Sequence, residues 1–376
     1  MEDTGYARTR RTLFSSARLL SVLNLDGPLL VGLALLAIYG LAILYSASGQ
    51  SIDTVIRTVI RLALGTAAML VLTHASPNLL RRISPWLYLL GVVLLVVVEI
   101  TGVIGKGAQR WLNLGLFRFQ PSEIMKLAVP MLAAWYLHDR PLPPDWRSMV
   151  VLAGIIFLPA GLVAMQPDLG TAALIAASGA LLVLMAGLSM RIVGALVLAG
   201  AGAAVLGWNF LHDYQRQRVL TFLNPQTDPL GAGYHIIQSQ IALGSGGVFG
   251  KGWMNGSQAQ LEFLPERSTD FIFAVVGEEF GLIGLVALLA LYIFIVARAV
   301  WLATQTNDTY SRLLALCLAL TFFVYVFINA GMVSGLLPVV GVPLPLVSYG
   351  GTSEVTLLAG FGILMGLYSH RKLVGT

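Results

Sequence analysis

Ten apolar runs, each close to the length of a bilayer-crossing helix, restrict the fold of this chain more than any other feature. A helix needs about 20 apolar residues to cross the hydrocarbon core of a membrane. The chain is 57% hydrophobic and 11% charged, so its apolar surface exceeds what one globular core could bury. We therefore predict an all-α polytopic membrane protein. The predicted spans are about 29–47, 57–74, 86–104, 121–138, 149–165, 170–187, 192–211, 271–297, 313–333 and 352–368.

Basic residues predict the orientation. Alternate short connections and both ends of the chain carry most of the Arg and Lys side chains, which places both termini in the cytoplasm. Residues 1–27 are interpreted as a retained cytoplasmic tail, because the first span is too long for a signal peptide and nine more follow. The net charge of +5 is a by-product of this bias, and no basic run interleaved with aromatic residues predicts nucleic-acid binding. Cys317, the single cysteine, excludes a disulfide within the chain.

Three outward connections are longer than a turn requires, at about 105–120, 212–270 and 334–351. Long connections in compact proteins are usually functional. The largest, 212–270, keeps an apolar spacing from Tyr234 to Leu243, which predicts a short amphipathic helix on the outer membrane surface. With no internal repeat visible, residues 1–376 are predicted to form a single membrane domain.

The strongest candidate for chemistry is Asp270, where the polar segment Leu264-Pro-Glu-Arg-Ser-Thr-Asp270 meets an apolar run. A carboxylate at the mouth of a membrane helix is costly unless a site uses it. The alternative is a helix cap, for which Asp is also favoured. Glu278 and Glu279 lie deeper in the same run, where at least one must be paired or protonated, and a structural role is expected for them.

Two further motifs place carboxylates on the same predicted face. Glu123 and Lys126 are spaced i, i+3 at the start of a span, so their side chains can pair, either as a scaffold for a site or in direct chemistry. Asp168 lies in Gln166-Pro-Asp-Leu-Gly170, a turn signature that joins two spans. A third outward carboxylate is more than a turn requires.

Cations also gather on this face: Lys106, Arg110, Arg216 and Arg218. Such residues suit a phosphate or diphosphate, and the alternative is attraction to anionic lipid headgroups. A glycine-rich stretch, Gly244–Gly252, superficially resembles a nucleotide-binding P-loop. It lacks the first glycine and the Ser or Thr after Lys251, so we reject that interpretation.

These motifs, together with Pro345-Leu-Val-Ser-Tyr-Gly-Gly351 and Gln120-Pro-Ser-Glu123, resemble the SEDS family (shape, elongation, division and sporulation) over nearly the whole chain. The stretches beginning at Lys106, His212 and Gly233 are most similar to its rod-elongation branch. Ser268 is a departure, because many relatives carry His there.

The resemblance implies a peptidoglycan glycosyltransferase in the bacterial cytoplasmic membrane that polymerises lipid II on the outer face. It implies Asp270 as the general base, supported by Glu123, Lys126 and Asp168, and a class B penicillin-binding protein as partner. The four cations above would neutralise the diphosphate. It identifies no certain cofactor, and a divalent cation, Mg²⁺ or Mn²⁺, is left open as a helper. The alternatives are a lipid II transporter and a non-catalytic scaffold, although informative residues on one face disfavour a transporter.

Overall fold

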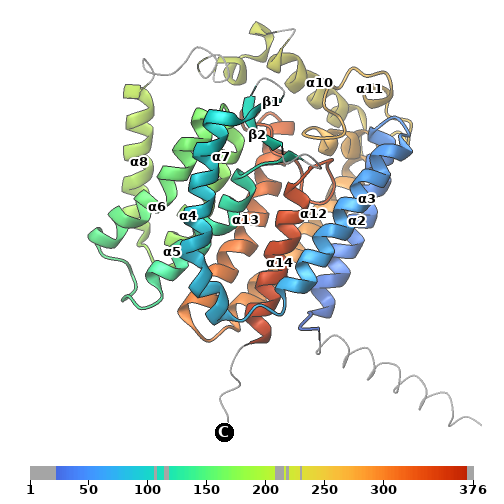
Figure 1. Ribbon diagram of the computed structural model, residues 1–376. Helices are drawn as coiled ribbons and strands as arrows, with labels where there is room; N and C mark the ends of the chain where they lie inside the picture. Colours follow the sequence, from blue (N-terminus) through green and yellow to red (C-terminus); the bar gives the residue numbers. More distant parts are fainter. Residues whose placement is uncertain are drawn as a thin grey trace, which may run out of the picture.

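The computed structural model describes residues 23–370 except 106–107, 114–117, 208–215, 217–219 and 229–230. Within this part of the chain, ten helices form a bundle, and a small sheet and shorter helices lie at one end of it (Figure 1). The bundle helices are α2 (Gly27–Ala47), α3 (Ile52–Leu72), α4 (Pro77–Thr101), α5 (Ser122–Leu137), α6 (Trp146–Met165), α7 (Leu169–Met185), α8 (Met190–Gly207), α12 (Ile272–Thr304), α13 (Thr309–Val333) and α14 (Ser353–Ser369).

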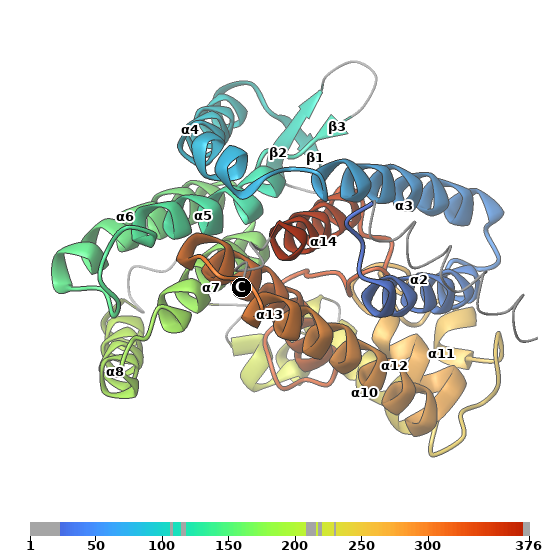
Figure 2. The same cartoon turned by 90° about the horizontal axis from the view of Figure 1, so that it is seen from below.

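Each predicted span is matched by one bundle helix, so the predicted polytopic α-helical fold is confirmed. Seen from below, α13 and α14 lie inside the bundle, with α2 and α3 on one side and α5, α6 and α7 on the other, while α8 stands at the edge (Figure 2). The predicted tail 1–27 lies outside the described residues except at its end. The single-domain interpretation stays a prediction.

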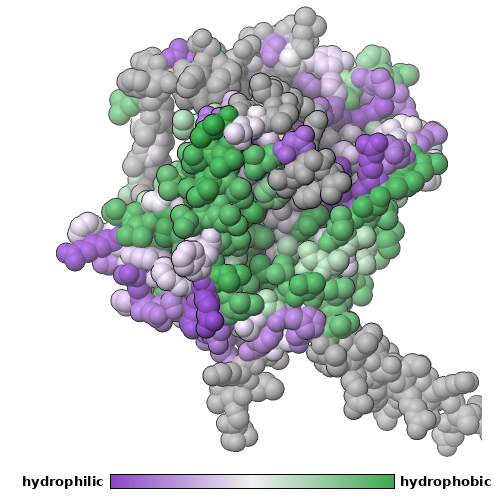
Figure 3. Space-filling model, viewed as in Figure 1, coloured by the Kyte–Doolittle hydropathy of each residue, from purple (hydrophilic) through white to green (hydrophobic). Residues whose placement is uncertain are grey.

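The outer surface of the bundle is suited to lipid. Hydrophobic side chains gather over its middle and hydrophilic ones toward its two ends (Figure 3). Large apolar side chains such as Ile38, Val71 and Ile100 are between 65% and 75% exposed. Among the described residues, six helices are long and apolar enough to cross a membrane, and α7 and α14 are shorter apolar helices. The chain is therefore a multi-pass membrane protein.

Capping side chains fix where some helices begin, and they shift two of the predicted boundaries. Ser51 accepts a hydrogen bond from Thr54 N and starts α3 at Ile52, whereas the span was predicted to begin at 57. Ser76 does the same for α4, which begins at Pro77 instead of 86. A capped first turn can be polar, because it extends beyond the apolar part of the helix. Hydropathy alone therefore misses these turns.

The two ends of the described chain meet at one end of the bundle. Ser369 Oγ donates to Asn24 Oδ1, and Asn24 Nδ2 donates to Thr73 O at 3.4 Å. Close by, Asp26 caps α2 and forms an ion pair with Arg298 at 2.7 Å. An even number of crossings returns the chain to its starting side, as the charge pattern predicted.

The opposite end carries the sheet and the short helices. Strands β1 (Val103–Gly105), β2 (Ala108–Asn113) and β3 (Arg118–Phe119) form an antiparallel sheet in the order β1-β2-β3, within a segment predicted only as a connection. Trp111 pairs with Val103, and Leu112 with Phe119. Strands this short have too few residues for an alternating pattern to be recognised.

The segment before α12 contains η2 (Pro225–Thr227), α10 (Ala232–Ser245) and α11 (Ser257–Gln260). Helix α10 confirms the helix predicted around Tyr234–Leu243. The two helices lie at the same end as the sheet (Figure 1).

Helix α12 is interrupted at Gly281, whose φ of 64° and ψ of −159° are not helical. Backbone groups of the glycine-rich stretch Gly246–Gly252 form hydrogen bonds with the α12 groups on both sides of the break. Lys251 N and Gly252 N donate to the carbonyls of Glu278 and Glu279, while Leu282 N donates to Gly247 O. A Cβ on Gly281 would lie 2.4 Å from Gly250 N, so only glycine permits this approach. The stretch that resembles a P-loop thus closes a gap in a membrane helix.

Candidate active site

A cavity of about 740 Å³ opens at the end of the bundle where α5, α7 and α14 begin and α12 enters. Its volume lies within the range of small-molecule sites. Five of the predicted site residues line it: Arg110, Glu123, Lys126, Asp168 and Asp270.

The other three predicted residues are not found among the lining residues. Arg216 is half-buried and is not among the lining residues, whereas Lys106 and Arg218 lie outside the described residues. Their predicted contact with a diphosphate stays a prediction.

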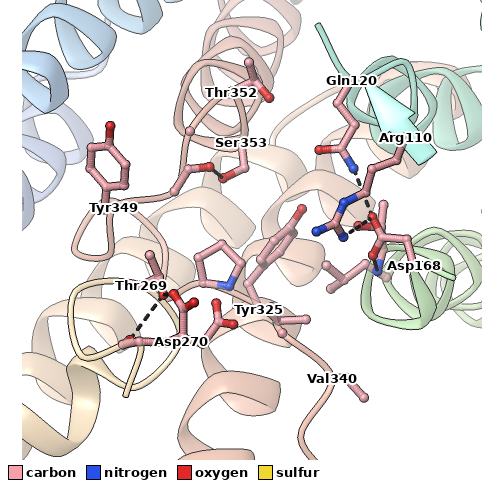
Figure 4. A pocket seen from close by; sticks show the side chains of 18 of the residues that line it. Arg110, Gln120, Asp168, Thr269, Asp270, Tyr325, Val340, Tyr349, Thr352 and Ser353 are labelled. Carbon is pink, nitrogen blue, oxygen red and sulfur yellow. Dashed lines mark hydrogen bonds and ion pairs between the residues drawn. The ribbon is translucent and has the colours of Figure 1, made fainter. Parts of the chain in front are cut away.

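Asp270 directly precedes α12, and its half-buried side chain lines the cavity (Figure 4). The N-cap position belongs to Phe271, and no side-chain cap bond is formed there. Asp270 therefore does not occupy the N-cap position of α12. Gly341 lies next to this carboxylate: its φ is +74°, and a Cβ at that position would lie 3.5 Å from Asp270 Oδ2.

Backbone contacts from distant segments hold the chain around Asp270. Tyr349 N donates to Ser268 O at 2.8 Å, and Ser348 Oγ donates to Thr269 O. Asn329, fully buried in α13, donates to Asp270 O. These bonds use the main chain of 268–270, so the Ser268 side chain is not what fixes Asp270.

Glu123 and Lys126 form a buried ion pair in the first turn of α5 (Ser122–Leu137), with 2.7 Å between Nζ and Oε1. Their side chains are 7% and 8% exposed, so each charge depends on the other. Lys126 Nζ also lies 5.4 Å from the ring centre of Tyr325, which lines the cavity. Removing one member of the pair would leave a buried charge without a partner, which is strongly destabilising.

Asp168 has two functions in this arrangement. Its Oδ1 caps α7 by accepting from Thr171 N, while Oδ2 accepts from Gln120 Nε2 at 3.0 Å and pairs with Arg110 at 3.2 Å (Figure 4). The turn chemistry expected from its motif is therefore present, together with a contact to a cavity cation. Asp168 fixes the direction in which Arg110 points.

The glycine of this motif is needed for packing. A Cβ on Gly170 would lie 2.3 Å from Val340 O. The start of α7 can therefore lie directly against the cavity-lining segment that includes Val340.

His235 of α10 approaches the cavity from the outer segment. Its ring stacks on Phe271 with centroids 5.6 Å apart, and its Nδ1 is buried without a hydrogen-bond partner. Burial lowers the pKa of His235 below its ordinary value of 6.5, and the carboxylates of Glu266 and Asp228 partly oppose this shift. The imidazole is therefore neutral near pH 7.

The two deeper carboxylates serve the structure. Glu278 is fully buried and accepts from Lys251 Nζ at 2.6 Å, Gln258 N at 2.9 Å and Ala259 N at 3.2 Å. Glu279 accepts from Ser46 Oγ. The prediction that one of them is paired is confirmed for Glu278, which ties α11 to α12.

Several lining residues were not singled out from the sequence as site residues: Arg61, Gln120, His235, Tyr325 and Tyr349. Asn329, which anchors Asp270, was also missed. Arg61, Tyr325 and Asn329 interrupt apolar runs, and a polar group inside a span is a signal that could have indicated them. Tyr349 and Gln120 lie in motifs that the sequence analysis quoted, but nothing in the sequence distinguishes them from the other residues of those motifs as site residues.

No group of three or more His, Cys, Asp or Glu side chains that could hold a metal ion occurs among the described residues. The divalent cation therefore stays a prediction.

The site combines a carboxylate at a helix entrance with fixed cations at one end of a membrane bundle, as in a membrane-embedded enzyme acting on an anionic lipid-linked substrate. The sequence pattern of the FtsW/RodA/SpoVE cell cycle protein family matches residues 27–373, and the chain belongs to this family, the SEDS proteins.

Individual relatives agree with this assignment. The peptidoglycan glycosyltransferase MrdB of Escherichia coli K12 is 51% identical over 352 residues, which cover 93% of this chain and 95% of that protein. The crystal structure of the rod shape determining protein RodA of Thermus thermophilus matches with a TM-score of 0.71 and 29% identity, covering 92% of this chain and 97% of that one. The resemblance to the rod-elongation branch is confirmed.

A second solved structure adds a larger assembly. It matches with a TM-score of 0.81 and 31% identity over 93% of this chain and 98% of that one. That structure is described as showing the coordination of polymerization and crosslinking by a peptidoglycan synthase complex.

Proposed function

We propose that this protein is a peptidoglycan glycosyltransferase of cell elongation, which polymerises lipid II with Asp270 as the general base. The observation that carries the proposal is the position of Asp270 in the same cavity as Arg110 and the Glu123–Lys126 pair. The glycosyltransferase activity of the relatives supports the same reaction.

The reaction requires one proton acceptor and one site for negative charge. Asp270 accepts the proton of the acceptor's 4-hydroxyl while that oxygen attacks the anomeric carbon of the donor. The bond from that carbon to the lipid diphosphate breaks with inversion, so no covalent enzyme intermediate forms. The charge that develops on the diphosphate needs a fixed cation. Arg110, held by Asp168, supplies it in the described part of the site.

Glu123 and Lys126 neutralise each other in an ion pair. In this scheme they therefore shape the wall of the cavity. Lys106, Arg216 and Arg218 remain candidates for further contacts with the diphosphate. Arginine suits this ligand because its guanidinium forms paired hydrogen bonds to phosphate oxygens.

The site is proposed to face outward from the bacterial cytoplasmic membrane. The cavity lies at the end opposite to Asn24 and Ser369, and the bias of basic residues assigns those ends to the cytoplasm. A class B penicillin-binding protein is the proposed partner, and the peptidoglycan synthase complex among the similar structures supports this.

The test uses purified full-length protein, with and without the partner, and labelled lipid II. The wild-type protein should make glycan chains, and Asp270→Asn should lower the rate by at least about 10²-fold, the usual contribution of a general base. Asp139→Asn, at an 81% exposed carboxylate, is the control and should keep the wild-type rate. Substantial polymerisation by a folded Asp270→Asn protein would refute the assignment. Movement of lipid II without polymer would instead indicate a transporter.

The helper metal is tested in the same assay. If a divalent cation takes part, EDTA should lower the rate and Mg²⁺ or Mn²⁺ should restore it. An unchanged rate after chelation would remove the metal from the scheme.

A further inference from the structure

Arg61 is a cavity cation that the proposed reaction has not used. It lies in α3 and lines the cavity together with Tyr349. Its Nη2 donates to Tyr349 Oη at 2.9 Å, and its guanidinium carbon lies 4.3 Å from the centre of the Tyr349 ring. The tyrosine therefore fixes the position of the guanidinium.

A second nitrogen of this guanidinium lacks a partner among the described protein groups. Arg61 Nη1 is buried, and no protein group accepts a hydrogen bond from it. A buried donor without an acceptor costs free energy, so its presence needs an explanation. A ligand oxygen bound in the cavity would supply the missing acceptor.

Arg61 also differs from the other described cations of the cavity. Arg110 pairs with Asp168 and Lys126 pairs with Glu123, whereas none of the described carboxylates forms an ion pair with Arg61. The buried Glu354 uses one oxygen to accept from Gly350 N, and its charge interacts with Arg61 without an ion-pair contact. Among the described lining residues, Arg61 is thus the cation whose charge is still available to a ligand.

The position of this cation points to a role separate from that of Arg110. Tyr349 and Arg110 lie on opposite sides of the cavity, and Asp270 lies at its lower edge in this view (Figure 4). A polymerase that joins two lipid-linked saccharides holds two diphosphates at once, one on the donor and one on the acceptor. One fixed arginine cannot neutralise both diphosphates if they lie on opposite sides of the cavity.

We propose that Arg61, positioned by Tyr349, binds the diphosphate of a second lipid-linked substrate, on the opposite side of the cavity from the diphosphate at Arg110. This inference rests on the proposed function, because it takes its ligand from that reaction. The group recognised is a diphosphate ester of a polyprenyl chain, and the contact is a charge-assisted hydrogen bond from Nη1 to a phosphate oxygen.

Binding can be measured without turnover in full-length Asp270→Asn protein in neutral detergent. The probes are geranylgeranyl diphosphate, geranylgeranyl monophosphate and geranylgeraniol, followed by intrinsic tryptophan fluorescence. Arg61→Gln should weaken diphosphate binding about tenfold and leave geranylgeraniol binding unchanged. Arg61→Lys should restore part of the affinity. An equal loss of affinity for all three probes would indicate a loss of packing alone and would overturn the proposal.

Arg191→Gln is the control for the loss of a positive charge. Arg191 lies in the first turn of α8, it is exposed, and it does not line the cavity. Diphosphate binding should stay within about twofold of the parent protein. An equal loss in Arg191→Gln and Arg61→Gln would show a general effect of charge and would also overturn the proposal.

Anionic lipid is an alternative source of phosphate. Adding phosphatidylglycerol to the detergent should not displace the diphosphate from the parent protein, and displacement that depends on Arg61 would assign the residue to headgroups instead. With Asp270 intact, Arg61→Gln should raise the KM for lipid II more than it lowers kcat. Failure of the parent protein to bind any diphosphate would count against the proposed function itself, whereas binding that survives Arg61→Gln would refute only this inference.

Discussion

Asn329 joins the main chain at Asp270 to the cavity-lining segment that includes Val342. Its Nδ2 donates to Asp270 O at 2.9 Å and to Val342 O at 2.7 Å, and its side chain is fully buried in α13. One amide group therefore sets the distance between the proposed base and the segment that faces it.

Asn329→Leu should separate these two segments. Two buried carbonyls would lose their donor, at about 1–3 kcal/mol for each unsatisfied group. We expect a lower melting temperature and at least a tenfold lower polymerisation rate, measured by scanning fluorimetry and with labelled lipid II. Ser178→Ala is the control, since this buried hydroxyl donates only to Ile175 O within its own helix. Wild-type activity in Asn329→Leu would show that Asp270 is positioned by other contacts.

The buried Glu123–Lys126 pair should tolerate replacement as a pair better than the loss of one member. Glu123→Gln or Lys126→Met alone leaves a buried charge without its partner, and breaking such a pair costs about 3–5 kcal/mol. The double variant Glu123→Leu with Lys126→Met should recover stability in thermal unfolding. The exchange Glu123→Lys with Lys126→Glu should recover part of the activity. If neither double variant improves on the single ones, the two side chains act on substrate separately.

Glu278→Gln should loosen the outer segment while leaving the bundle folded. The carboxylate holds Lys251 and two backbone N–H groups of α11, and the amide keeps the size of the side chain but not its charge. We expect a loss of about 1–3 kcal/mol in the local stability of 246–264. Hydrogen–deuterium exchange of that segment should rise, while exchange in α13 stays unchanged. Glu279→Gln is the comparison, because Glu279 contacts Ser46 of α2 instead of α11.

Acid should destabilise the site through His235. The folded protein holds the pKa of this imidazole below 6.5, so the unfolded chain binds its proton more readily as the pH falls. Stability is therefore retained above pH 6.5 and lost as the pH drops below it toward the folded pKa. Melting temperatures between pH 7.5 and 5.5 should fall more steeply for the wild-type protein than for His235→Gln. Equal slopes would show that His235 does not contribute.

Local chemistry made the predicted spans and several site residues accessible from the sequence. Apolar runs of about 20 residues indicate crossing helices without any knowledge of their neighbours. Asp168 lies in a short motif that predicts a turn, and the spacing of Glu123 and Lys126 predicts an ion pair. Asp270 marks the point where a polar segment meets a helix.

The missed features depend on partners far away in the chain. Asn329 is 59 residues from Asp270, and Arg61 is 288 residues from Tyr349. The break at Gly281 is invisible to hydropathy, because the residues on both sides are apolar and backbone groups from 247–252 replace the lost helical bonds. Such contacts follow from the packing of whole helices and have no signature at either residue alone.

The wide spread of the cavity lining along the chain also affects how the protein is made. Arg61 enters the membrane with the second bundle helix, Asp270 with the eighth, and Ser353 with the last. A chain still emerging from the ribosome thus carries isolated polar side chains and no assembled site. The site becomes complete only when α14 has been inserted against α3, so premature termination upstream of this helix yields a protein without a complete site.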